Sequence, residues 1–424
     1  MNGDHSIPAD FRGVIEECAI RATEETAEGA PEYERFRVIS DEVGIFLYIL
    51  ARSTWRTRMS DMGGWGGAAS SIIWLAGAAN ETDGEVTAWE TNPRRFLKLQ
   101  NCLSRARLAP NVELLGADPL WDFRDDTDSP MERITVRETE PGEPGSIPGK
   151  GSDLVVASLL EPDWIHRLRK GWDLLDIDGL LVLTDTLQGG GQAEAALSDF
   201  FKSRLAATVS FPLGEGVLIV VKLSADHRDP DVPVHELMVG QKANEVLEEI
   251  QERNRMPGAH LMAIPPATGR FLWTLVYSMQ AKNVLEIGAS AGYSGTWLAS
   301  ALKLTEGSLT TMDHDPKKVS MARESYDRAG VGDVVEILEG DAHEIVPTLE
   351  DPYDLVFLDC DKKYYQDLLE PILWRLKRGG LLVADNVISH GEILKGYVDQ
   401  VQHHPCLASV TVPVGSGEET TMVL

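Results

Sequence analysis

Three polar residues follow two short apolar segments in the second half of the sequence. Asp359 comes directly after residues 355–358, and Asp385 and Asn386 come directly after residues 381–384. If both segments are parallel strands, their carboxyl ends converge at one edge of the sheet and bring two carboxylates and an amide oxygen together. Such hard oxygen donors suit Mg²⁺ with open coordination positions better than zinc. Unpaired acids at the rim of an acidic protein are the alternative interpretation.

A glycine-containing turn lies earlier, between an apolar segment and the start of a predicted helix. Gly288 and Gly292 are separated there by three residues. Glycines at such a turn allow a ligand to approach the backbone and to face the N-terminus of a helix. The spacing G-x-x-x-G, rather than G-x-G-x-x-G, disfavours a site for the pyrophosphate of a dinucleotide. A tight packing turn is the alternative.

Two further acids follow the next two predicted strands. Asp313 could accept both hydroxyls of a ribose, because an ionised carboxylate has two acceptor oxygens. Asp341 could face an adenine amino group, or it could cap the helix that follows it, and the sequence leaves both readings open.

Residues from about 235 to 424 resemble the cation-dependent O-methyltransferases of the caffeoyl-CoA and catechol type. The resemblance rests on ordered motifs, and in the first half it covers only the scaffold. The motifs are Gly269-x-Phe271-Leu272, Leu285-Glu286-Ile287-Gly288-x-x-x-Gly292-Tyr293-Ser294, Glu339-Gly340-Asp341-Ala342, Asp354-Leu355-Val356-Phe357-Leu358-Asp359-x-Asp361-Lys362-x-x-Tyr365, and Gly379-Gly380-Leu381-Leu382-Val383-Ala384-Asp385-Asn386-Val387.

This resemblance implies a cofactor, a metal and a general base at particular positions. It implies a divalent metal, usually Mg²⁺, on Asp359, Asp385 and Asn386, and it implies that Lys362 is the general base. It implies substrate contacts from Asp359 and from His390, which stands where the family commonly has Asn. It also implies S-adenosylmethionine held by Glu286, Gly288, Ala289, Gly292, Ser294, Asp313, Asp341 and Ala342.

The expected reaction is methyl transfer to a hydroxyl of a small vicinal-dihydroxy aromatic substrate. A free phenol has a pKa near 10 and is a poor nucleophile at neutral pH. A cation held against both oxygens would stabilise the phenolate, and Lys362 could take the proton. A solvated lysine at a helix start is the alternative for Lys362, as the adjacent Lys363 illustrates. A non-catalytic S-adenosylmethionine-binding sensor or scaffold is a second hypothesis for the protein, and an NAD-linked oxidoreductase is a distant third.

The first half of the sequence repeats the pattern of the second half. Residues match in the same order at offsets of 225, 223 and 201 positions. Representative pairs are Gly44 with Gly269, Trp74 with Trp297, and Gly179 with Gly380. Internal similarity on this scale indicates a tandem duplication.

The first copy lacks most of the residues that could do chemistry. Glu90 keeps an acid at the ribose position, but the positions of the three predicted metal ligands and of Asp361 are exchanged. The exchanges are Ser158 for Asp359, Leu160 for Asp361, Thr184 for Asp385 and Asp185 for Asn386. We expect this copy to be non-catalytic and to imitate the second subunit of a homodimer within the chain. A cofactor-binding regulatory domain and a cap over the acceptor pocket are the alternatives.

Alternating strand-like and helix-like segments predict the α/β class. We expect two tandem Rossmann-like class I methyltransferase domains, each a mostly parallel, doubly wound sheet with an antiparallel edge strand. The expected division is a degenerate domain at 1–223 with a helical lead at 1–57 and an insertion at about 122–151, a linker at 224–234, and a catalytic domain at 235–424. Residues 421–424 are expected to form the last edge strand.

Composition limits the classes of partner. The 424 residues carry a formal net charge of −28, which argues against sequence-independent binding to nucleic acid or to anionic membranes. The four cysteines are scattered without a C-x-x-C pair, which favours a reducing compartment and predicts no zinc site or disulfide framework. No apolar stretch is long enough to span a membrane, so we expect a cytoplasmic protein. The partner that the resemblance implies is a small aromatic diol. Further oligomerisation stays open.

Overall fold

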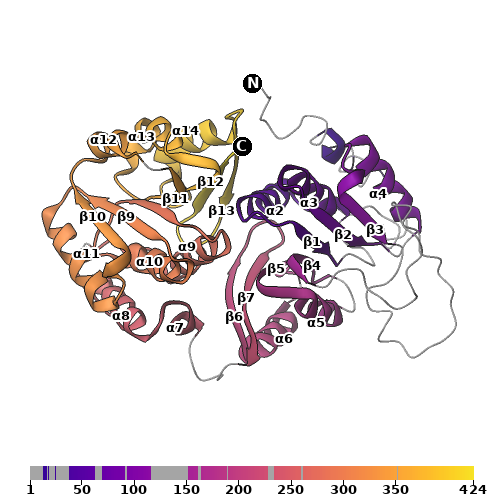
Figure 1. Ribbon diagram of the computed structural model, residues 1–424, viewed down its shortest axis with the longest axis horizontal. Coiled ribbons are helices and arrows are strands. Elements are labelled where there is room, and N and C mark those ends of the chain that lie inside the picture. Colours follow the sequence, from indigo (N-terminus) through magenta and orange to yellow (C-terminus); the bar gives the residue numbers. More distant parts are fainter. Residues whose placement is uncertain are drawn as a thin grey trace. The chain divides into compact units, whose positions relative to one another are not determined.

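The computed structural model contains two compact units, one formed mainly by residues 7–227 and the other mainly by residues 228–424. Figure 1 shows the helices and strands of both. The residues that the structure describes are 13–16, 18, 24, 38–62, 69–90, 93–115, 151–160, 164–188, 190–227, 234–258, 261–350 and 352–424. Most of the predicted helical lead and almost all of the predicted insertion lie outside these residues.

The N-terminal unit is built on a seven-stranded sheet in the order β3-β2-β1-β4-β5-β7-β6. The strands β1 to β5 pair in parallel, and β7 pairs with β5 in antiparallel orientation. The strands are β1 (Arg58–Asp61), β2 (Glu85–Trp89), β3 (Val112–Leu115), β4 (Ser152–Ser158), β5 (Leu175–Thr184), β6 (Arg204–Phe211) and β7 (Val217–His227). Its helices are α2 (Asp41–Ser53), α3 (Ala69–Thr82), α4 (Pro93–Arg105), α5 (Trp164–Leu174) and α6 (Gly190–Lys202), with a 3-10 turn η2 (Ala109–Asn111).

The C-terminal unit has the same strand order, β10-β9-β8-β11-β12-β14-β13. The strands are β8 (Asn283–Ile287), β9 (Ser308–Asp313), β10 (Val335–Glu339), β11 (Tyr353–Leu358), β12 (Leu376–Ala384), β13 (Leu407–Val412) and β14 (Glu418–Val423). The α-helices are α7 (Val234–Val239), α8 (Gln241–Arg255), α9 (Pro266–Ser278), α10 (Tyr293–Thr305), α11 (Pro316–Ala329), α12 (Ala342–Ile345), α13 (Tyr365–Leu373) and α14 (Gly391–Gln402). The 3-10 turns are η4 (Gly332–Val334), η5 (Val346–Thr348) and η6 (Lys362–Tyr364).

Each sheet is covered by helices on both faces, which explains why its central strands are apolar throughout. Leu381, Leu382 and Val383 of β12 are all fully buried, as expected for a strand with no solvent-facing side. In the C-terminal unit, α13 and α14 pack into one core with the strands, and α9 and α10 lie on the other face (Figure 1). The predicted fold class, a pair of Rossmann-like doubly wound sheets, is therefore confirmed.

One packing contact recurs in both units at equivalent positions. A Cβ atom on Gly44 would lie 2.0 Å from the indole nitrogen of Trp74, and one on Gly269 would lie 2.3 Å from that of Trp297. Only glycine allows the helix backbone to approach the indole this closely. The repeated contact and the shared strand order are the structural observations that favour a duplication.

Two sequence-based expectations about strands need correction. Residues 421–424 were expected to form an edge strand, but β14 lies between β12 and β13 and pairs with both in antiparallel orientation. Along the chain, β13 at the edge of the sheet comes before β14, which lies between β13 and β12. The sequence analysis also missed β6.

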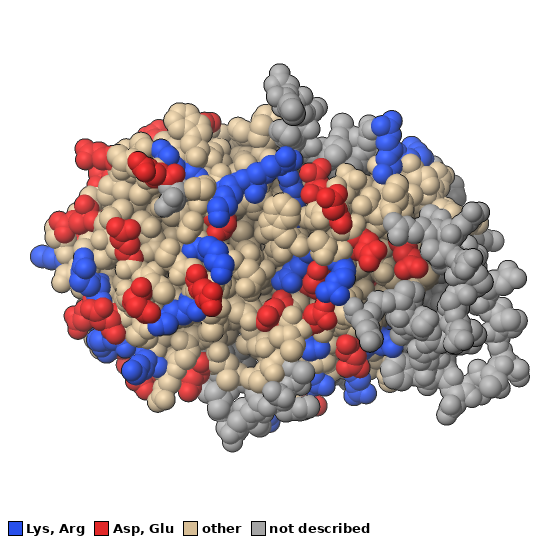
Figure 2. Space-filling model, viewed as in Figure 1, with Lys and Arg blue, Asp and Glu red and all other residues tan. Residues whose placement is uncertain are grey.

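The segment that joins the two units is only partly described. The strand β7 continues to His227, so the first residues of the predicted linker belong to a strand. Residues 228–233 lie outside the described part of the chain. Among the described residues, no helix is both long and apolar enough to cross a membrane. On the face drawn in Figure 2, acidic and basic side chains of the described residues are interspersed rather than segregated.

Candidate functional site

The two predicted metal-binding carboxylates lie at the ends of adjacent strands. The backbone N–H of Asp359 donates to Ile287 O at 3.0 Å, and that of Asp385 donates to Leu358 O at 3.1 Å. These bonds continue the parallel pairing of β8, β11 and β12 for one more residue. The sheet therefore places both acids at its carboxyl edge, as the sequence predicts.

Lys362 lies directly against the first of these acids. Its Nζ is 2.7 Å from Asp359 Oδ1 and also donates to Cys360 O at 3.0 Å. The side chains of Lys362 and Asp359 are only 11% and 14% exposed. The neighbouring Lys363 instead pairs with Asp361 at 2.9 Å, where both side chains are more than half exposed. The two lysines thus occupy different environments, and only Lys362 is held at the site.

A third carboxyl group belongs to this cluster, and the sequence analysis missed it. Glu418 is fully buried at the start of β14, where Thr268 Oγ1 donates to its Oε1 at 3.1 Å. Burial, together with the adjacent Asp385, raises the pKa of Glu418 well above its usual range. Its other carboxyl oxygen, Oε2, is buried without a hydrogen-bond partner among the described residues. Burial and then the charge of Asp359 raise the pKa of Asp385 to about 6.

Asn386 has a backbone conformation that suits its residue type. Its φ of 70° lies in the left-handed region, which Asn tolerates better than most residues. Its side-chain nitrogen donates to Ser389 Oγ at 3.3 Å, which leaves the amide oxygen available to a ligand.

Tyr365 holds the ends of β11 and β12 together, because its hydroxyl contacts Leu358 O at 2.9 Å and Asp385 O at 3.2 Å. Among the described residues, no group of three or more His, Cys, Asp or Glu side chains could hold a metal, and the predicted ligand set includes the amide of Asn386.

The glycines of the predicted cofactor turn have packing reasons of their own. Gly288 has a φ of +113°, and a Cβ there would lie 2.2 Å from Asp359 O. Gly292 caps α10 in the left-handed conformation, with a φ of +84°, and a Cβ there would lie about 3 Å from Tyr326 and Ala322. Both glycines are therefore required by the protein itself, whether or not a ligand approaches them.

Two acids lie next to this turn. Asp313 accepts the backbone N–H of Ser290 and that of Asp315, each at 3.0 Å, so each carboxylate oxygen retains one lone pair for a further donor. Glu286 is fully buried, and its Oε1 has no hydrogen-bond partner among the described residues. Burial raises the pKa of Glu286 to about 7, although hydrogen bonds from Ser294 and Thr311 oppose the shift.

The remaining predicted cofactor and substrate residues are less enclosed. Asp341 is exposed and caps α12 by accepting the N–H of His343 at 2.9 Å, so the capping interpretation fits its geometry. Hydrogen bonds from the backbone and ring of His343 lower the pKa of Asp341. Ala342 follows at the start of α12. Ala289, by contrast, is buried within the turn between β8 and α10. His390 is exposed at the start of α14, 3.0 Å from Ser389 Oγ.

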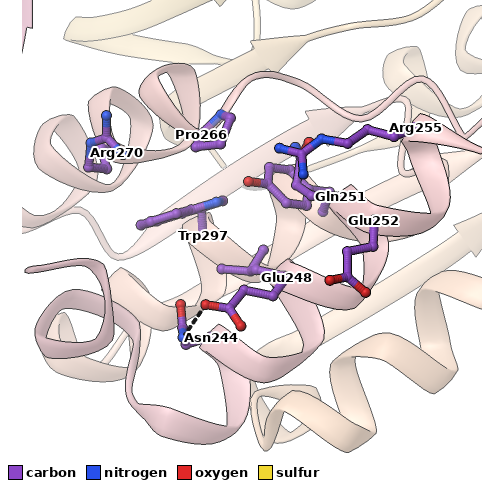
Figure 3. Close-up of a pocket in the computed structure, with 10 residues that line it drawn as sticks. Asn244, Glu248, Gln251, Glu252, Arg255, Pro266, Arg270 and Trp297 are labelled. Atoms are coloured by element: carbon purple, nitrogen blue, oxygen red, sulfur yellow. Dashed lines mark hydrogen bonds between the residues drawn. The ribbon is translucent and has the colours of Figure 1, made fainter. Parts of the chain in front are cut away.

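The structure also contains a cavity that the sequence analysis did not predict. It has a volume of about 240 Å³ and lies between α8, α9 and α10. Figure 3 shows its lining, which includes Arg255, Arg270 and Trp297. None of the predicted metal or base residues lines this cavity, so it is separate from the carboxylate cluster.

The equivalent positions in the N-terminal unit are closed by their own side chains. Asp185 has a φ of 63°, as Asn386 does, but its Oδ2 accepts the hydroxyls of Ser158 at 2.5 Å and Thr184 at 2.9 Å. Glu90, at the expected ribose position, forms a buried ion pair with Arg95 through both carboxylate oxygens, at 2.9 and 2.8 Å.

Sheet pairing shows that the N-terminal unit also lacks the third carboxyl group. Val217 of β7 pairs with Thr184 of β5. Its counterpart in the C-terminal sheet is Glu418, at the start of β14. An apolar residue thus stands where the C-terminal unit has a buried acid.

Comparison with known proteins identifies the family of the C-terminal unit. Residues 238–411 match the O-methyltransferase family. The chain is 32% identical over 166 residues to a caffeoyl-CoA O-methyltransferase of Populus kitakamiensis, a match that covers 37% of this chain and 70% of that protein. The chain belongs to the O-methyltransferase family.

Two bacterial catechol O-methyltransferases are also similar to this part of the chain. The protein from Niastella koreensis is 40% identical over 141 residues, which cover 32% of this chain and 63% of that protein. The protein from Mycobacterium tuberculosis is 40% identical over 134 residues, which cover 31% of this chain and 60% of that protein. The matches thus span somewhat less than two thirds of these two relatives.

Proposed function

We propose that the C-terminal unit, residues 235–424, transfers a methyl group from S-adenosylmethionine to one hydroxyl of a small vicinal-dihydroxy aromatic compound, with the help of a divalent cation. The observation that carries this proposal is the cluster of Asp359, Asp385 and Asn386 at adjacent strand ends, with Lys362 held against it. The relatives named for catechol and caffeoyl-CoA support an acceptor of this class.

The cluster has the chemistry expected of a site for a hard cation. Burial and then the charge of Asp359 raise the pKa of Asp385, and Lys362 forms an ion pair with Asp359 rather than with Asp385. A divalent ion would relieve this repulsion, and oxygen ligands with room for water or substrate suit Mg²⁺. Asp359, Asp385 and Asn386 would hold the ion.

The turn has a corresponding site for a cofactor. Glu286 Oε1 is a buried acceptor without a donor, and the hydroxyls of a ribose could satisfy such an acceptor. Asp313 lies at the end of the neighbouring strand, and the Gly288–Gly292 backbone faces the N-terminus of α10. These residues, with Ala289, Ser294, Asp341 and Ala342, would bind S-adenosylmethionine.

The residues of the chain would perform three tasks in the reaction. When bound, the cation would stabilise a phenolate and S-adenosylmethionine would donate the methyl group. Lys362 Nζ would accept the hydroxyl proton, and Asp359 would orient that amine through the 2.7 Å contact. Tyr365 would keep both strand ends fixed, so that the acceptor oxygen and the methyl group meet in line. His390 would contact the acceptor from the start of α14.

We infer that the N-terminal unit is non-catalytic and serves as a structural partner. Asp185 is already satisfied by two hydroxyls, and Arg95 neutralises Glu90 within the protein interior. A ribose would have to displace this buried guanidinium, which is costly because a buried carboxylate would lose its partner.

A chelation experiment tests the metal-dependent reaction. We expect methylation of catechol to disappear after exhaustive chelation and dialysis, and to return when Mg²⁺ is added. Asp359→Ala should remain inactive when Mg²⁺ is restored. Methylation that survives chelation, or that persists in Asp359→Ala, would contradict the proposal. Cofactor binding without turnover on any catechol, together with indifference to Lys362→Ala, would instead favour a sensor or scaffold.

A further inference from the structure

Two cysteines that are far apart in the sequence lie in contact in the N-terminal unit. Cys18 and Cys102 are 84 positions apart, and their sulfur atoms are 3.2 Å from each other. Both are buried, with exposed fractions of 2% and 6%, and both are thiols in the structure. The sequence analysis treated the cysteines as scattered, because a separation of this size gives no local signal.

Both cysteines belong to ordered apolar surfaces. Cys18 is helical and is buried, as are Ile15 and Val14, three and four positions before it. Cys102 lies on α4, where Leu99 and Arg95 precede it by three and seven positions and are also buried. Residues at these spacings share one face of a helix. The sulfur atoms thus meet between the buried faces of two helical segments.

We propose that Cys18 and Cys102 form an oxidation site, at which a reversible disulfide joins the helical residue Cys18 to α4. A shift of roughly 1 Å would bring the sulfur atoms to the bonding distance of about 2.05 Å. The packing holds them together at a high effective concentration, which favours the intramolecular bond over a mixed disulfide.

The oxidant is a low-molecular-weight disulfide. One cysteine thiolate attacks a sulfur of that compound, whose S–S bond breaks and releases one thiol. The second cysteine then attacks the mixed disulfide, so that the Cys18–Cys102 bond forms and a second thiol leaves. Two electrons pass to the oxidant, and the two cysteine protons end on the two released thiols.

The bond would act on the helix that closes the unused cofactor position. Arg95, which pairs with Glu90, lies on α4 two turns before Cys102. A cross-link between residues 18 and 102 also closes a long loop of the unfolded chain, which stabilises the folded unit. Oxidation would therefore hold the closed form of this unit in place.

The test is to incubate the folded full chain with mixtures of oxidised and reduced glutathione and then to map the peptides without reduction. We expect one cross-linked peptide pair containing Cys18 and Cys102, with a mass 2 Da below that of the two thiols. The bond should form at least about tenfold faster in the folded chain than in denaturant, because only folding brings the sulfurs together. Hydrogen exchange across α4 should slow after oxidation.

Matched cysteine variants separate this bond from other oxidation. Cys406 is exposed in the C-terminal unit, so Cys406→Ser should retain the cross-link, whereas Cys18→Ser and Cys102→Ser should each abolish it. If one variant does not fold, peptide mapping of the wild-type chain still decides the question. Glutathione adducts on Cys406 without any Cys18–Cys102 peptide, or equal rates in folded and denatured chains, would overturn the proposal.

Discussion

Lys362 and Lys363 are neighbours in the sequence, but only Lys362 faces a largely buried carboxylate. The difference arises because Lys362 starts η6 directly above Asp359, whereas Lys363 points to the exposed Asp361. The sequence register favoured Lys362, which follows Asp359 by three positions, and the structure places its ammonium group against that carboxylate.

The two lysines provide a matched test of the general base. We expect Lys362→Met to lower kcat about 10²- to 10⁴-fold, in line with the usual contribution of a general base, with little change in the KM for S-adenosylmethionine. Lys363→Met should remain within about twofold of the wild type, because an exposed ion pair contributes little. The measurement is steady-state kinetics on catechol at saturating Mg²⁺. Equal losses in both variants would assign no special role to Lys362.

A second residue-scale prediction concerns the buried carboxyl of Glu286. Its pKa rises from 4.5 to about 7 on folding, so between these values the folded chain holds more protons than the unfolded chain. The stability that this group contributes is complete below pH 4.5 and is lost as the pH rises through 7. The loss is on the order of 3 kcal/mol, at about 1.4 kcal/mol per pKa unit.

Denaturant unfolding of the cofactor-free chain between pH 4.5 and 8 measures this effect. We expect Glu286→Gln to show a shallower fall in stability than the wild type, because the amide does not titrate. Asp385 and Glu419 also have raised pKa values, and comparison of the two chains cancels their contribution. Parallel pH profiles for the two chains would show that Glu286 does not carry the effect.

The residue that sequence analysis could not find is Glu418. Its motif partners lie more than thirty positions earlier, and its strand was read as an exposed edge, where an acid needs no explanation. Insertion of β14 beside β12 turns this acid inward against Asp385. The pairing of Glu90 with Arg95 was equally hidden, because it depends on the burial of both side chains rather than on their spacing.

At the scale of elements, the turn between β8 and α10 is constrained by its own neighbours. A Cβ on Gly288 would clash with the backbone carbonyl of Asp359, so the predicted cofactor turn and the end of β11 are in contact. This contact explains why local sequence patterns located the turn correctly: the glycine spacing reports a backbone requirement. The order of β13 and β14 has no comparable local signal, because either order suits the same hairpin.

Two alanine substitutions separate the strain of a positive φ from a steric clash. Gly288→Ala should destabilise the C-terminal unit by several kcal/mol, since its Cβ would lie 2.2 Å from a backbone oxygen. Gly379 has a φ of +76°, and a Cβ added there would meet nothing within 4 Å. Gly379→Ala should therefore lower the stability by about 1–2 kcal/mol, from backbone strain alone. Thermal unfolding of both variants provides the measurement. A cost for Gly379→Ala equal to that for Gly288→Ala would rule out the clash.

At the scale of the whole molecule, two sheets of the same strand order differ in the side chains at their carboxyl edges. One edge has Asp359, Asp385 and Glu418, and the other has Ser158, Thr184 and Val217 in the corresponding places. The N-terminal sheet therefore reaches this strand order without the acids, which favours a functional role for Asp359 and Asp385 in the C-terminal unit.

We accordingly expect each chain to bind one S-adenosylmethionine and one divalent cation. Isothermal titration should give a stoichiometry near one for each ligand. Asp385→Asn should abolish detectable cation binding, whereas Asp185→Asn, the equivalent change beside the N-terminal site, should leave it intact. A stoichiometry of two, or a loss of binding in Asp185→Asn, would assign a working site to the N-terminal unit.

The shared strand order also creates a hazard during folding, since β7 and β14 could each complete the wrong sheet. Their compositions oppose this exchange. The strand β7 presents Val217 to Val221 to its neighbours, whereas β14 presents Glu418, Glu419, Thr420 and Thr421, all of them buried. If β14 were inserted beside β5, Glu418 and Glu419 would be buried next to Leu183 and Thr184. They would then lose the hydrogen bonds that Thr268, Ser409 and Gln402 donate to them. The glutamates of β14 thus favour the sheet that supplies their hydrogen-bond partners, and one of them, Glu418, lies beside the predicted metal ligand Asp385.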